Sequence, residues 1–176
     1  MFSFRWAETS DIPAIAALME RAIAVLQQDF LTPAQITASR SVMGLDTQLI
    51  ADGTYLLAEK NGRLAACGGW SARATLYGGD HSQKLRDATM LDPARDPARI
   101  RAMYVDPDFA RRGLGRAILA RCEAAAQDAG FHSAEMMATL AGEPLYRACG
   151  YETIEPVLSA PVDGVRVPLI RMGKRL

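Results

Sequence analysis

Residues 98–139 contain a strand, a glycine-bearing loop, a long helix and a second strand in close succession. ARIRAMYV at 98–105 has the apolar content of a strand, and residues 113–129 carry an apolar residue at every fourth position, namely Leu114, Ile118, Cys122 and Ala126. Gly130 follows as a helix C-terminal cap, before a further strand over 134–139. A connection of this kind makes the two strands parallel, with the helix crossing right-handed over one face of the sheet. The chain is therefore predicted to fold as a mixed α/β sheet around one parallel crossover.

The remaining segments supply further strands and helices. TYLLAEKNGRLAACGGW is the clearest hairpin, because the apolar runs Tyr55–Glu59 and Leu64–Trp70 flank the tight-turn pair Asn61-Gly62. The polar stretch 71–97 is predicted to be a long loop. The other predicted elements are a strand in FSFRW, a helix over about 11–27 capped by Thr9 or Ser10, short helices opening at Thr32-Pro33 and near 145–149, and strands near 151–157 and 165–172 around a turn at Asp163-Gly164.

Charge and composition exclude several classes of function. The 176 residues carry 20 basic and 20 acidic side chains, so no net positive field is present to hold nucleic acid or an anionic membrane. No apolar run approaches the roughly 20 residues of a membrane-spanning helix, and the first residues lack the pattern of a secretory signal. We expect one domain over residues 1–176, located in the cytoplasm.

Cysteine and histidine are too few and too scattered to predict a metal centre. Cys67, Cys122 and Cys149 form no C-x-x-C pair, and His81 and His132 lie far apart in the sequence. The cysteines are expected to be buried thiols in a reducing compartment. We predict no metal ion.

The segment ARRGLG, residues 110–115, lies where the long helix begins and has the chemistry of an anion site. A glycine at a helix start leaves the backbone open to a ligand, and the first turn carries free N–H groups at the positive end of the helix dipole. Phosphate groups favour such a position. The predicted seat comprises the amides of Gly113, Leu114, Gly115 and Arg116 together with the guanidinium groups of Arg111, Arg112 and Arg116.

Three interpretations of this glycine motif compete. A nucleoside-triphosphatase P-loop requires a Gly-Lys-Ser/Thr ending, which the segment lacks. A dinucleotide fingerprint requires a third small residue where Ile118 stands, and a tighter turn than VDPDFARR allows. In the third interpretation the glycines only shape a loop beside solvated arginines, and the motif alone leaves this one open.

Three pieces of the chain in fixed order carry a family resemblance. They are Val105-Asp106-Pro107 at a strand end, the segment 110–115 at a helix start, and Tyr146-Arg147-Ala148-Cys149-Gly150-Tyr151. These pieces resemble the signature of the GCN5-related N-acetyltransferases, the GNAT family, whose motifs read Val-x-Pro, [Q/R]-x-x-G-x-[G/A] and Y-x-x-x-G-[FY]. Ala110 departs from the Gln or Arg of the second motif, so any contact of that side chain is absent. The predicted element order matches the family over nearly the whole chain.

The resemblance implies a fold, a cosubstrate and an activity. The fold is a mixed, mostly antiparallel sheet with a central parallel strand-helix-strand crossover and helices on both faces. Acetyl-CoA is the implied acyl donor, its pyrophosphate on residues 111–116 and its pantetheine arm on the backbone of Met103 and Val105. Tyr146 matches the tyrosine that family members place beside the sulfur, where it would stabilise the departing thiolate; otherwise it is a core residue.

The implied activity is direct transfer of an acetyl group to an amine of a small molecule or peptide, and a homodimer is compatible with the resemblance. The alternative is a non-catalytic acyl-CoA sensor or interaction domain with the same fold. Neither the general base nor the acceptor follows from the sequence. Candidate bases are Glu59, Asp80, His81 and Glu135, or a chain of waters.

Three segments are expected to border the acceptor. The resemblance points to QQDFL at 27–31 and LSAPVDGV at 158–165, and the long loop 71–97 is expected to add a wall. The aromatic and imidazole side chains considered as lining residues are Phe30, Trp70, Tyr77 and His81.

Overall fold

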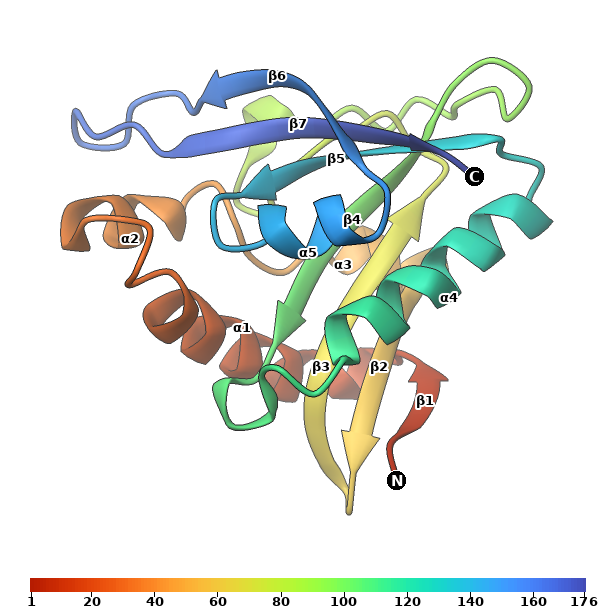
Figure 1. The fold of residues 1–176 in the computed structure, drawn as a ribbon, viewed down its shortest axis with the longest axis horizontal. Coiled ribbons are helices and arrows are strands. Elements are labelled where there is room, and N and C mark those ends of the chain that lie inside the picture. The colour runs from red at the N-terminus through yellow and green to blue at the C-terminus, as the bar shows by residue number, and fades with distance from the viewer.

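One seven-stranded sheet runs through the molecule in the computed structural model, which describes residues 1–176 (Figure 1). The strands lie in the order β1-β2-β3-β4-β5-β7-β6. Their bounds are β1 (Ser3–Trp6), β2 (Tyr55–Lys60), β3 (Arg63–Ser71), β4 (Ala98–Val105), β5 (Ser133–Thr139), β6 (Glu152–Leu158) and β7 (Pro168–Arg175). All neighbouring pairs are antiparallel except β4 and β5. The predicted mixed, mostly antiparallel sheet with one parallel crossover is confirmed.

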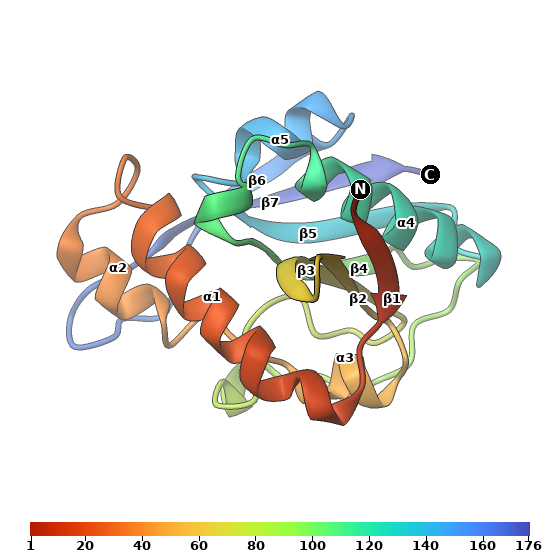
Figure 2. The same cartoon turned by 90° about the horizontal axis from the view of Figure 1, so that it is seen from below.

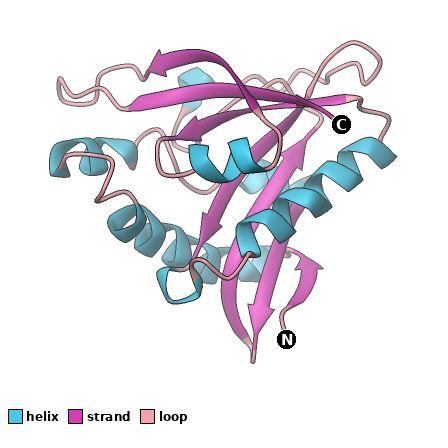
Figure 3. Cartoon of the chain, in the orientation of Figure 1, coloured by secondary structure: helices cyan, strands magenta, loops and turns pink.

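Helices cover both faces of this sheet (Figures 2 and 3). The helix of the crossover, α4 (Leu114–Asp128), lies on one face with α5 (Glu143–Ala148), while α1 (Ile12–Leu26) and α3 (Thr47–Ala51) lie on the other. The short α2 (Pro33–Ser39) packs through Ala38 near β7. Single 3-10 turns are η1 (Thr9–Asp11), η2 (Gln83–Leu85) and η3 (Pro107–Phe109). None of the helices combines the length and apolar character needed to cross a bilayer.

The two largest apolar clusters lie on the two faces, and β2 contributes to both. Its alternate residues point in opposite directions, so that Leu56 and Ala58 pack beneath α4 while Tyr55 and Leu57 pack against the α1 side. This double burial explains the continuous apolar run in the sequence of this strand. The predicted stripe of α4 is also confirmed, since Leu114, Ile118, Cys122 and Ala126 are all buried.

Local turn chemistry places the hairpin and the crossover helix. Asn61 and Gly62 have φ values of 51° and 74°, the left-handed pair that a two-residue hairpin turn requires. Gly130 ends α4 at φ 94°. Both turns therefore have the residues that their backbone conformation needs.

Several predicted boundaries are wrong in detail. The first helical segment is not capped by Thr9 or Ser10: Glu8 and Asp11 cap it reciprocally, each side chain bonding to the backbone of the other. The sequence analysis missed α3, whose five residues are too few to show a periodic pattern and whose cap is Asp46. β7 begins at Pro168 rather than near 165, because Ser159 holds the preceding segment through the N–H of Val167.

The parallel strands β4 and β5 stay paired for only two residues. Ala98 pairs with Ala134 and Arg99 with Glu135, and the strands then diverge (Figure 1). β4 also bulges against β3 at Ala102, whose φ is 50° and whose carbonyl accepts a hydrogen bond of 2.8 Å from the Tyr55 hydroxyl. The consequence is a V-shaped opening in the middle of the sheet.

Candidate active site

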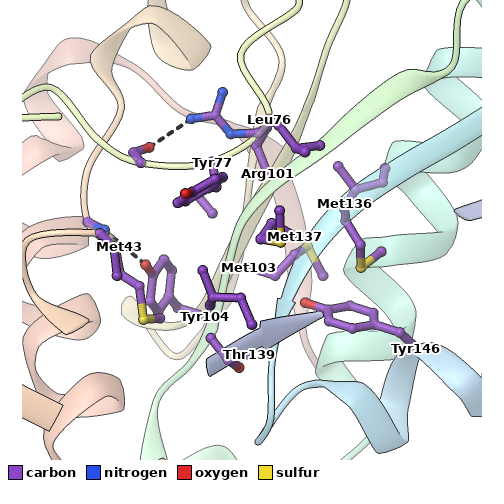
Figure 4. A pocket seen from close by; sticks show the side chains of 16 residues that line it. Met43, Leu76, Tyr77, Arg101, Met103, Tyr104, Met136, Met137, Thr139 and Tyr146 are labelled. Carbon is purple, nitrogen blue, oxygen red and sulfur yellow. Dashed lines mark hydrogen bonds between the residues drawn. The ribbon is translucent and has the colours of Figure 1, made fainter. Parts of the chain in front are cut away.

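The opening between β4 and β5 is a cleft of about 610 Å³, counted with the part open to solvent. Four parts of the chain line it: residues 42–44, residues 76–78, residues 100–104 of β4, and side chains of β5, α5 and β7 (Figure 4). Most of the lining is apolar, with four methionines among it. A cleft of this kind, with a few polar groups, is the usual form of a small-molecule site.

Tyr146 projects from α5 into this cleft. Its hydroxyl points between the two strands and makes no hydrogen bond within the chain, whereas the Tyr104 hydroxyl accepts one of 3.1 Å from the Gly44 N–H (Figure 4). Gly142 makes room for the ring, since a Cβ there would lie 2.8 Å from Tyr146 Cε2. Burial raises the pKa of Tyr146 above its ordinary value. The phenol therefore stays protonated and is available as a hydrogen-bond donor.

The N-terminus of α4 lies at the end of the loop that follows β4, and its backbone amides are free. Gly113 is the N-cap at φ 78°, and its carbonyl accepts from Ala117. No backbone N–H between residues 111 and 116 has an acceptor within the chain. A Cβ built on Gly113 meets no atom within 4 Å, so the space in front of it is open to a ligand. This arrangement has the chemistry of an anion site.

The three arginines at this helix start have no carboxylate partner, unlike their neighbours. Arg111, Arg112 and Arg116 form no ion pair, and Arg112 stacks on the Phe109 ring at 5.5 Å from its centroid. Asp106 and Asp108, the nearest acidic side chains in the sequence, are instead paired with arginines from α1 and β3, Arg21 and Arg63. The positive charge beside the free amides is therefore not neutralised by the protein.

Gly115 has a packing role in addition to the predicted amide contact. A Cβ at Gly115 would lie 2.7 Å from Leu145 Cδ2, so the absence of a side chain there lets α5 approach α4 closely. Leu145 is thereby held against α4, and Tyr146, the next residue of α5, lines the cleft. The second glycine of the motif thus shapes the helix contact, and only Gly113 faces open space.

Of the two predicted β4 contacts, Met103 and Val105, only the first lines the cleft. Met103 lines the cleft, and its side chain packs over Gly68 toward α4. Val105 is outside the lining, and its side chain faces Gly115. Any contact of Val105 with a ligand in the cleft would have to come from its backbone.

None of the four candidate bases lies in the lining of the cleft. Glu135 accepts hydrogen bonds from Arg99 and Arg171 at 3.1 and 2.6 Å, and Glu59 pairs with Arg5 at 2.7 Å. Asp80 accepts from the Thr47 N–H and from Arg86. His81 is exposed but comes close, with its Cε1 beside Gly44, a lining residue. The carboxylates are held by other groups, which leaves His81 or water.

The long loop 71–97 forms one wall of the cleft, as predicted, through Leu76, Tyr77 and Gly78. Arg101 of β4 fixes this wall: its guanidinium donates to the carbonyls of Thr75 and Gly78 at 3.1 and 2.8 Å. The same group donates to Asp46 Oδ2 at 2.9 Å in a pair that is almost fully buried. Arg86 adds a second cation to Asp46. Residues far apart in the sequence thus close the cleft together.

Other expected lining residues lie elsewhere. Trp70 packs in the core with its ring 6.0 Å from that of Phe131, and Phe30 is 45% exposed on the surface. The segments 27–31 and 158–165 contribute no lining residue, whereas residues 42–44 do. The sequence analysis missed this last segment because Val-Met-Gly has no motif and reaches the cleft only through the turn after α2. Cys149, expected to be buried, is partly exposed.

A comparison of the sequence with protein-family models shows the family of this chain. The model of the acetyltransferase (GNAT) family matches residues 17–151, more than half of the chain. The chain belongs to the GNAT family. It is therefore an acyltransferase, and acetyl-CoA is the acyl donor of this family.

Solved structures of GNAT proteins share the fold of this chain. A GCN5-related N-acetyltransferase from Rhodopseudomonas palustris superposes with a TM-score of 0.71 at 19% identity, covering 99% of this chain and 95% of that one. The protein yncA from Salmonella typhimurium, solved with acetyl-CoA, has a TM-score of 0.64 at 18% identity over 99% and 94% of the two chains.

A third structure is the paia N-acetyltransferase from Thermoplasma acidophilum in complex with coenzyme A. It gives a TM-score of 0.66 at 11% identity, over 100% of this chain and 99% of that one. No curated protein matches the sequence. At these identities the likeness establishes the GNAT architecture and leaves the acceptor to the chain's own residues.

Proposed function

We propose that this GNAT protein transfers the acetyl group of acetyl-CoA directly to a primary amine bound in the cleft between β4 and β5. The observation that carries the proposal is the run of unpartnered N–H groups at 111–116, flanked by unpaired arginines, at the start of a helix that contacts Leu145, the residue before Tyr146 of the cleft. A diphosphate anion on Gly113 and an extended arm along β4 would place a thioester near that phenol. The neighbours solved with coenzyme A or acetyl-CoA support this placement.

In the proposed reaction the amine nitrogen attacks the thioester carbonyl carbon. A C–N bond forms and the C–S bond breaks, so that the thiolate departs with the electron pair and the extra proton of the nitrogen passes to solvent. The backbone of β4 beyond Arg99 has no strand partner on the β5 side, and its groups are free to bind the arm, with those of Met103 and Val105 as the proposed contacts. Acetyl-CoA supplies the activated acyl group.

Tyr146 stabilises the departing thiolate by donating a hydrogen bond. Even with ordinary values, transfer of a proton from a phenol of pKa about 10 to a thiolate of pKa about 8.5 is uphill by roughly 2 kcal/mol. Burial raises the pKa of Tyr146 further, which makes complete transfer less favourable still. The phenol is therefore proposed as a donor rather than as a general acid.

Substitution of Tyr146 by Phe is expected to lower kcat at least about tenfold while leaving the affinity for acetyl-CoA nearly unchanged. Because the phenol stays protonated, the ratio of wild-type to variant rates should be constant between about pH 7 and about pH 9. Steady-state rates and calorimetric binding measure the two effects. Tyr104→Phe is the matched control, as its hydroxyl is bound to Gly44; equal turnover in wild type and Tyr146→Phe would remove the proposed role.

The experiment that tests the function as a whole is a panel of amines incubated with the protein and acetyl-CoA, with release of thiol and formation of the amide followed in parallel. A thiol reagent requires a protein blank, because Cys149 is partly exposed. Burial raises the pKa of Cys67 and Cys122 to about 12, so these two thiols should not contribute. Release of thiol that depends on an amine supports the transferase, whereas binding of acetyl-CoA without transfer to any amine would favour the sensor.

Two finer predictions accompany the proposed function. A cytoplasmic location is proposed because the three cysteines remain free thiols rather than disulfides. The homodimer stays a prediction that the oligomeric state in solution would test.

A further inference from the structure

The part of the cleft where we place the acceptor contains no charged side chain that lacks a partner. Its walls are Met43 from the turn after α2, Leu76 and Tyr77 from the long loop, and Met137 and Leu169 from β5 and β7 (Figure 4). Arg101 is the one charged residue in the whole lining. The guanidinium of Arg101 is engaged by Asp46 and by two loop carbonyls, and burial lowers its pKa while Asp46 opposes that shift.

The carboxylates around this part of the cleft are also engaged. Asp46 is shared between Arg101 and Arg86, and Asp80 is bound by Arg86 and by the N–H and hydroxyl of Thr47. Glu135, on the neighbouring strand, is bound by Arg99 and Arg171. A cationic group on the acceptor would therefore find no anion in the cleft, and an anionic group would find no cation with free donors beyond its existing bonds.

Resting on the proposed function, we infer that the acceptor presents its amine on an uncharged, apolar body, and that polyamines, lysine-rich peptides and amino acids with free carboxylates are discriminated against. A buried charge without a partner disfavours binding, whereas methylene groups gain by leaving water. The flexible methionine side chains accommodate such a body without a fixed shape. The reacting nitrogen enters as the neutral amine, because no carboxylate in the lining accepts its proton.

Three probes of equal chain length test the inference. Butylamine has an uncharged body, putrescine is the same chain with a second amino group at the far end, and γ-aminobutyrate carries a carboxylate there. With kcat/KM expressed per neutral reacting amino group, butylamine is expected to be acetylated at least about tenfold more efficiently than either charged probe, because of the unpaired charge. Equal or better use of either charged probe would overturn the inference.

A reciprocal variant tests the same idea by adding the missing charge. Leu76→Glu introduces a carboxylate on the loop wall, and should raise the kcat/KM ratio of putrescine to butylamine about tenfold or more. Leu76→Gln, of similar size and without charge, is the matched control and should leave that ratio within about twofold. An unchanged ratio in Leu76→Glu would place the acceptor body elsewhere and so overturn the inference.

Failure of the inference differs from failure of the proposed function. Calorimetric titration of each protein with acetyl-CoA is run beside the rate measurements. Suppose that acetyl-CoA binds. If a charged amine is then the better substrate, or if butylamine is not acetylated, the inference is wrong while the proposed donor site stands. If acetyl-CoA does not bind, the proposed function itself is wrong, and the inference falls with it.

Discussion

Replacement of Gly113 by Asp is expected to weaken binding of acetyl-CoA at least about 100-fold. The new carboxylate would project into the open space before the free amides of residues 111–116, where the diphosphate is proposed to lie. Two unit charges about 4 Å apart repel by about 4 kcal/mol at an effective dielectric constant near 20. Each 1.4 kcal/mol is about tenfold in affinity, so even half of that repulsion exceeds a factor of about 20 before the added bulk is counted.

Thermal denaturation with and without acetyl-CoA measures the effect. A ligand at about 100 times its dissociation constant stabilises the folded state by about 2.7 kcal/mol, and this shift should disappear in Gly113→Asp. Gly53→Asp is the matched control: Gly53 also has a left-handed φ, 70°, and open space around it, but lies in the turn before β2. The two variants share the backbone strain, so retention of ligand-induced stabilisation in Gly113→Asp would contradict the proposed seat.

Removal of the Asp46 carboxylate should destabilise the fold strongly. Asp46 and Arg101 are 3% and 4% exposed. Asp46→Ala leaves the guanidinium of Arg101 buried without a counter-charge, bonded only to the two loop carbonyls. Breaking a buried pair in this way costs about 3–5 kcal/mol. The free energy of unfolding in urea should fall by this amount, with an unchanged m-value.

Two further variants separate the buried pair from surface charge. Glu20→Ala removes an ion pair that is closer, with Arg40 at 2.7 Å, but lies on the surface, and should cost no more than about 1 kcal/mol. The double variant Asp46→Asn with Arg101→Met removes both charges and should recover part of the loss, because the two sites are coupled. A loss of less than about 1 kcal/mol for Asp46→Ala would show that the pair does not hold the loop wall.

The parts of the fold that could be predicted from the sequence are those set by local chemistry. Asn61-Gly62 specifies its own turn because both residues tolerate a left-handed φ, and the four-residue spacing in α4 follows from helix geometry alone. The position of Gly113 at the start of α4 could be predicted from the local pattern in the same way.

The parts that could not be predicted depend on contacts between distant segments. The bulge at Ala102 is held by the hydroxyl of Tyr55 on another strand, and the wall at residues 76–78 is held by Arg101. The packing role of Gly115 was missed because its neighbour, Leu145, comes from the following helix. The pairing of the three candidate carboxylates could not be foreseen for a related reason, since each is neutralised by an arginine that sequence spacing does not reveal.

The short pairing of β4 with β5 gives the protein an unusual internal surface, namely the equivalent of an edge strand in the middle of a sheet. Outer edges of this kind recruit strands from other molecules and lead to aggregation unless they are covered. Here the unpaired margin opens only onto an apolar crevice bordered by Tyr146 and residues 76–78. A slender chain with amide groups of its own can complete the ladder there.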